Sequence, residues 1–160
     1  MARFITEQQH ASSCGPVAII NALKWLGYSV SYREELPTFT KLGYDDGTNC
    51  YDLRRMLNAY QIKYKLYKQS SIKKLEQILN RGNTAIVCYD WVGPEDRGGH
   101  YIFIDSDLKH SFGAYNYQIG IETGALRKDT LDAYFYTTKK RFRNAKTSSK
   151  WKPAVWEIIK

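Results

Sequence analysis

This sequence has little that would direct it to a membrane, a metal or an oxidising compartment. Its 160 residues contain no run near the roughly 18 apolar residues that a membrane-spanning helix needs. Residues 1–7 lack the apolar core of a secretory signal peptide. The three cysteines and three histidines show neither CxxC nor HxxxH spacing, so no metal site and no cofactor is expected. We therefore expect no membrane span and a cytoplasmic location, which for a viral chain is the host cell.

A disulfide framework is not expected either. The cysteine count is odd, and disulfides are rare in proteins that are not secreted. Cys88 lies in an apolar run and is expected to be an inert core thiol, whereas Cys50 lies near a helix start, where a reactive thiol is the alternative. The apolar content of 43% is ordinary, and with this length it predicts a single domain over residues 1–160.

Helical patterns fill the front half of the chain and strand patterns the back half. Helices are predicted at about 15–26, after Thr48, and from Ser71 to about Gly82, with a loop or short helix over 28–48. The predicted strands are 62–67, 84–91, 100–105, 112–117 and 154–159; 119–124 is strand or loop, and 130–136 is a short helix. This order favours an α+β fold, with the helical front half packed on an antiparallel sheet.

Cys14 is the first candidate for chemistry, because an apolar helical pattern begins directly after it. Helix N-termini carry unpaired N–H groups and a partial positive charge. A thiol there can have its pKa lowered from about 8.5 toward about 3.5–7.5, and the thiolate is the nucleophile. The sequence therefore predicts a reactive Cys14 with a lowered pKa.

His100 is the matching base candidate, at the head of the apolar strand 100–105. A hairpin through the turn at 106–110 would bring it beside Asn116 on the neighbouring antiparallel strand. A histidine can accept the thiol proton and return it to a leaving amine. These positions together indicate nucleophilic catalysis by a thiol.

These residues resemble the papain-like cysteine peptidases, and among them the double-glycine-leader (bacteriocin-processing) peptidases and their stand-alone relatives. That family places a Gln six residues before the nucleophile, as Gln8 stands before Cys14, and a Gly before the base, as before His100. It places an Asp or Asn about sixteen residues after the base, where Asn116 stands. Ser13 departs from the Asp that many members carry before the nucleophile. We expect no transport domain beside this one, so the resemblance is not expected to imply export coupled to cleavage.

The resemblance implies a papain-like fold and a role for each of these residues. Cys14 would be the nucleophile, His100 the base, and Asn116 the residue that orients the imidazole by a side-chain hydrogen bond. The Gln8 amide and the Cys14 backbone N–H would stabilise the oxyanion. Three alternatives remain open, namely Gln9 as oxyanion donor, Asp105 as third member and His10 as base.

The net charge of +8 is concentrated late in the chain. Seven basic residues and no acidic ones lie between Lys139 and Lys152. The segment is expected to be a solvated loop, and the alternative is that it binds an anionic partner such as nucleic acid. Phe142 and Trp151 lie among the basic residues, as in nucleic-acid binding segments.

The function predicted from these observations is that of a cysteine peptidase acting on a peptide or isopeptide amide in a peptide or protein substrate. The alternatives are a thiol amidase or transpeptidase acting on a small amide, and an inactive papain-like module that binds an anionic partner. The substrate pocket is expected between the loops 28–48 and 92–99, and the second loop carries the charged residues Glu95, Asp96 and Arg97.

Overall fold

The computed structural model describes residue 4 and residues 13–42, 50–68, 70–90, 99–116, 123–144 and 154–160. The helices are α1 (Cys14–Trp25), α2 (Tyr32–Lys41), α3 (Cys50–Ala59), α4 (Ile72–Asn80) and α5 (Lys128–Asn144). The strands are β1 (Lys63–Tyr67), β2 (Thr84–Asp90), β3 (Gly99–Asp107), β4 (Ser111–Tyr115), β5 (Thr123–Arg127) and β6 (Ala154–Ile159). They form an antiparallel six-stranded sheet in the order β1-β6-β2-β3-β4-β5. The predicted α+β fold is confirmed.

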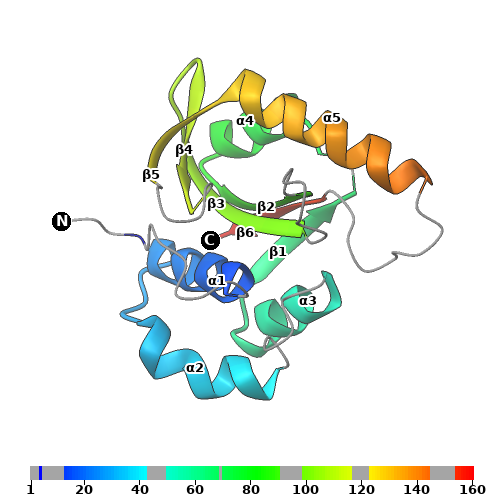
Figure 1. The fold of residues 1–160 in the computed structure, drawn as a ribbon. Helices are drawn as coiled ribbons and strands as arrows, with labels where there is room; N and C mark the ends of the chain where they lie inside the picture. The colour runs from blue at the N-terminus through cyan, green and yellow to red at the C-terminus, as the bar shows by residue number, and fades with distance from the viewer. Residues whose placement is uncertain are drawn as a thin grey trace.

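Helices cover both faces of the sheet (Figure 1). α1, α2 and α3 lie on one face, and α4 and α5 lie on the other. Because side chains alternate along a strand, each central strand contributes to both cores. Along β3, Tyr101 and Phe103 pack in the core of α1, whereas Ile102 and Ile104 pack in the core of α4 and α5. We call these the α1 core and the α5 core.

The first helix forms where the sequence predicts it, within one residue at each end. Its residues from Cys14 to Leu23 are buried, so α1 is a central helix of the molecule rather than a surface helix. It ends before Gly27, whose φ of 98° lies in the left-handed region that glycine adopts without strain.

The segment 28–48 contains a longer helix than the loop or short helix predicted for it. Ser31 caps α2 by accepting a hydrogen bond from the Glu34 N–H at 3.2 Å. Pro37 lies inside this helix of ten residues and removes one backbone donor. Burial of Phe39, which has no exposed surface, favours the helix despite that loss.

The late helix is also longer than predicted. α5 runs for 17 residues instead of the seven predicted at 130–136, and it therefore includes the first part of the basic segment. The prediction of a loop is wrong for residues 139–144, which are helical; residues 145–152 lie outside the described part of the chain. None of the described helices combines the length and the apolar character needed to cross a membrane.

The hairpin of β3 and β4 forms as predicted, with Phe103 opposite Tyr115. Its register shifts between Ile104 and Ser106. β6 pairs with β1 on one side and with β2 on the other, so it joins the edge strand β1 to the rest of the sheet. The hairpin and α1 are the elements that carry the candidate catalytic residues.

Candidate active site

Cys14 is the first residue of α1 and lies in the α1 core, with 7% of its surface exposed. Pro16 has no N–H, and the Val17 N–H already donates to the Ser13 carbonyl at 2.9 Å. The remaining donors at this helix end are the N–H groups of Cys14 and Gly15, and both contribute to the environment of the thiol. The helix start therefore surrounds the sulfur with backbone donors, as expected.

The predicted lowering of the Cys14 pKa is wrong for this structure. Burial raises the pKa of the thiol, because the charged thiolate loses its hydration. Backbone hydrogen bonds from Tyr101, Gly15 and Cys14 itself lower the pKa, but they do not outweigh burial. The thiol in this environment is neutral at pH 7, so a base must remove its proton when it reacts.

The hydrogen bond with Tyr101 shows where the thiol meets the sheet. Tyr101 directly follows His100 on β3, and a hydrogen bond that lowers a thiol pKa comes from a donor, here the backbone N–H. The sulfur of Cys14 therefore lies against β3 within one residue of His100. Two candidate residues that are 86 positions apart in the sequence (100 − 14) thus lie near the start of the same strand.

His100 is buried, with 3% of its surface exposed, and its Nε2 lies 2.5 Å from the backbone carbonyl oxygen of Asn116. A carbonyl oxygen can only accept, so Nε2 carries the proton and Nδ1 is the nitrogen that can accept another. Asn116 has a φ of 66°, a left-handed conformation that asparagine adopts more readily than most residues. The predicted proximity of His100 and Asn116 is confirmed, and the hydrogen bond goes to the backbone carbonyl of Asn116. The role of the Asn116 side chain stays a prediction.

One tyrosine outside the predicted site adjoins His100, and a second tyrosine stacks on the first. Tyr89 on β2 is its cross-strand partner, and the two rings meet edge to face at 5.7 Å and 72°. Tyr134 on α5 stacks on Tyr89 at 5.1 Å and 13°. Sequence reasoning missed both, although an aromatic content of 14% was the available hint.

The other sequence candidates are separated from this site or lie outside the described residues. Asp105 accepts a hydrogen bond from Ser106 at 2.9 Å at the β3 irregularity, about 16 Å along the strand from His100. Cys88 is buried on β2 in the α1 core, as predicted. Outside the described part lie Gln8, Gln9, His10, the loop 92–98 and the side chain of Cys50. Among the residues described, no cluster of three metal-ligating side chains occurs.

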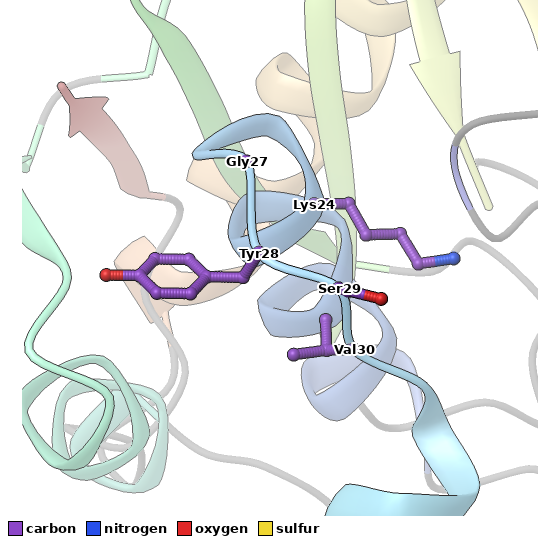
Figure 2. Close-up of a pocket in the computed structure, with 5 residues that line it drawn as sticks. All are labelled: Lys24, Gly27, Tyr28, Ser29 and Val30. Carbon is purple, nitrogen blue, oxygen red and sulfur yellow. The ribbon is translucent and has the colours of Figure 1, made fainter.

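The beginning of the predicted pocket loop 28–48 lies at the other end of α1. A pocket of about 420 Å³ occurs there, lined by Lys24, Gly27, Tyr28, Ser29 and Val30. Of the residues that line it, Lys24 and Tyr28 extend their side chains in opposite directions (Figure 2). The twelve residues of α1 place this pocket about 18 Å from Cys14, so residues 28–30 do not flank the thiol.

Comparison with known proteins supports the fold but supplies no sequence relative. No family model and no curated protein matches the sequence. The peptidase domain of Streptococcus ComA, a bi-functional ABC transporter involved in a quorum sensing pathway, is similar with a TM-score of 0.69 and 11% identity, covering 99% of this chain and 100% of that domain.

Two further solved structures are similar over almost the whole chain. A double glycine motif protease from an AMS/PCAT transporter, in complex with the leader peptide, has a TM-score of 0.63 and 11% identity, covering 98% of this chain and 91% of the other. A protein described as a C39-like peptidase, from Bacillus anthracis, has a TM-score of 0.62 and 10% identity, covering 98% of this chain and 94% of the other. Identity this low establishes the fold alone. The chain therefore has the papain-like α+β fold of the C39 peptidase domains, the fold that the sequence resemblance predicted.

Proposed function

We propose that this chain is a cysteine peptidase that cleaves a peptide or isopeptide amide, with Cys14 as nucleophile and His100 as base. The observation that carries the proposal is the contact of the Cys14 thiol with β3 at Tyr101, the residue that follows His100. The thiol accepts a hydrogen bond from the backbone N–H of Tyr101, and the imidazole of His100 is anchored by its Nε2 on the Asn116 carbonyl. The similarity in fold to peptidase domains supports the same reading.

The geometry supports a general-base mechanism. His100 accepts the proton of the neutral thiol at Nδ1 while the sulfur of Cys14 attacks the carbonyl carbon. The developing oxyanion lies near the N–H groups at the start of α1, and Gln8 is proposed as the side-chain donor. His100 then returns the proton to the leaving amine, and water hydrolyses the thioester. An anchored Nε2–H keeps the ring in the one tautomer that serves both steps.

A peptidyl acyloxymethyl ketone probe tests this proposal, because such a probe alkylates a thiol only after binding like a substrate. Peptides ending in Gly-Gly are the first to test, because a protein of similar fold is a double glycine motif protease. We expect stoichiometric labelling that maps to Cys14 and that disappears in His100→Ala. Cys88→Ala is the matched control and should label like the wild type, because Cys88 is buried on β2. Labelling at another cysteine would overturn the assignment.

The variant Asn116→Gly separates a backbone anchor from a side-chain anchor. Glycine keeps the carbonyl and tolerates the φ of 66° at this position, so a backbone anchor predicts turnover near that of the wild type. Loss of the carboxamide would instead reduce turnover about 10²-fold or more if the side chain orients the ring, by analogy with other triads. Circular dichroism of Asn116→Gly controls for the fold, because the side chain it removes is buried.

A further inference from the structure

We propose that Tyr89 and Tyr134 are positioning residues that hold the imidazole of His100 from the face of the sheet opposite to the nucleophile. The inference rests on the proposed function, and it assigns α5 a part in catalysis. Cys14 belongs to the α1 core, whereas Tyr89 belongs to the α5 core. The α1 core would thus support Cys14 on one face of the sheet, and Tyr89 and α5 would support His100 on the other face.

One hydrogen bond does not fix a planar ring. The bond from Nε2 to the Asn116 carbonyl holds the imidazole at one atom, and rotation of the ring about that contact is limited by its other neighbours. The edge-to-face contact with Tyr89 restricts this rotation, because the cross-strand pairing fixes where the Tyr89 side chain begins. The two contacts together would hold in one direction Nδ1, the atom proposed to accept the thiol proton.

Tyr89 itself needs support from α5. Its ring is 1% exposed and lies nearly parallel to the ring of Tyr134, at a centroid distance of 5.1 Å. Leu131 and Phe135 of the same helix are fully buried in the α5 core, so this part of α5 is held firmly on the sheet. The stack therefore transmits the position of α5 through Tyr89 to His100.

Kinetics of four variants test the proposal. Tyr89→Leu should lower kcat by up to about 10²-fold with KM little changed, because a displaced base acts on the chemical step and not on substrate binding. Tyr89→Phe keeps the ring and should restore most of the rate. Tyr134→Ala should give a smaller fall in kcat. Tyr136→Ala is the matched control: this tyrosine of the same helix is 69% exposed and should leave kcat unchanged.

Histidine NMR gives a readout that needs no substrate. The chain has three histidines, so the ¹⁵N signals of His100 can be assigned with one variant at each position. We expect the wild type to show the Nε2–H tautomer, and Tyr89→Leu and Tyr134→Ala to show mixed tautomers or broadened signals, with Tyr136→Ala like the wild type. If Tyr89→Leu does not fold, comparison of the His100 signals in Tyr134→Ala and Tyr136→Ala tests the positioning role.

The two measurements distinguish failure of the inference from failure of the proposed function. Unchanged His100 signals in folded Tyr89→Leu and Tyr134→Ala would overturn the positioning role even in an active peptidase. A wild type without turnover, whose His100 signals respond as described, would overturn the peptidase assignment and leave the support of the ring established. Equal loss of kcat in Tyr134→Ala and Tyr136→Ala would assign the effect to the helix as a whole and would also contradict the inference.

Discussion

Replacing Arg81 by methionine should destabilise the protein, because it removes the cation from a buried carboxylate. Glu157 on β6 is 3% exposed. Its oxygens accept hydrogen bonds from Arg81 Nε at 3.1 Å and Nη2 at 2.8 Å, from Asn83 Nδ2 at 2.8 Å and from the Tyr67 hydroxyl at 2.8 Å. Methionine retains much of the arginine stem but neither donor.

The magnitude follows from the exposure of the two partners. Breaking a buried ion pair costs about 3–5 kcal/mol. The Arg81 side chain is 46% exposed, so water replaces part of its contact, and Asn83 and Tyr67 remain as donors. We therefore expect a loss of about 2–3 kcal/mol, which for a protein of this size lowers Tm by roughly 6–9 °C.

Thermal unfolding followed by circular dichroism measures this loss, with Arg127→Met as the matched control. Arg127 donates to Asp129 at similar distances, 3.0 and 2.8 Å, but both side chains are about two thirds or more exposed. The Tm of the control should stay within error of the wild type. Equal Tm losses in the two variants, or no loss in Arg81→Met, would refute the reasoning from burial.

The pH dependence of stability tests the same ion pair between Arg81 and Glu157, because its contribution depends on the charge of Glu157. Burial alone would raise the pKa of Glu157, but Arg81, Asn83 and Tyr67 outweigh it and hold the pKa below its ordinary value. A carboxyl group with a lowered pKa stabilises the fold above its unfolded pKa of about 4.3, and the contribution is lost as the pH falls through the folded value. The Tm difference between the wild type and Arg81→Met should therefore shrink in acid.

Three further predictions concern the candidate site and the basic segment. Because burial raises the pKa of Cys14, its alkylation by iodoacetamide should reach half its maximal rate above pH 8.5, whereas a midpoint below pH 7 would show that the helix end dominates. Gln8→Ala should lower kcat by about 10²–10³ with little change in KM, and the same loss in Gln9→Ala instead would move the oxyanion donor by one residue. Neutralising the basic residues of late α5 should weaken polyanion binding in filter-binding assays, and this loss should be smaller at high salt. Hydrolysis of a small neutral amide should stay unchanged. Loss of that hydrolysis would place this segment in the substrate cleft. These residues are Lys139, Lys140, Arg141 and Arg143.

The parts of the site that depend on local patterns could be predicted from the sequence. Apolar spacing and Gly27 define α1, and the short turn after β3 defines the hairpin that brings His100 to Asn116. Both signals lie within a few residues of the element they define. The contact with Tyr89 could not be predicted, because cross-strand neighbours depend on the register of β2 against β3, which no single segment specifies.

Where the sequence misled, a strong local signal competed with a weaker or distant one. The polar segment 28–48 suggested a loop or short helix, but the capped start at Ser31 and burial of Phe39 favour a helix of ten residues. The basic residues after 138 suggested a solvated loop, although lysine and arginine are good helix formers, and α5 continues to Asn144. The helix end suggested an acidic thiol at Cys14, whereas burial by distant parts of the chain sets the direction of its pKa.

The place of β6 in the sheet has a consequence for synthesis of the protein. It fills the gap between β1 and β2 (Figure 1). The hydrogen bond from Tyr67 to Glu157 joins residues 90 positions apart. A nascent chain that has not reached residue 154 has β1 and one side of β2 without their neighbour. Such late, non-local pairing slows folding and leaves strand edges that associate with other chains. Chains arrested before this strand should therefore be held by chaperones or degraded, although the described elements from α1 to α5 have already been translated.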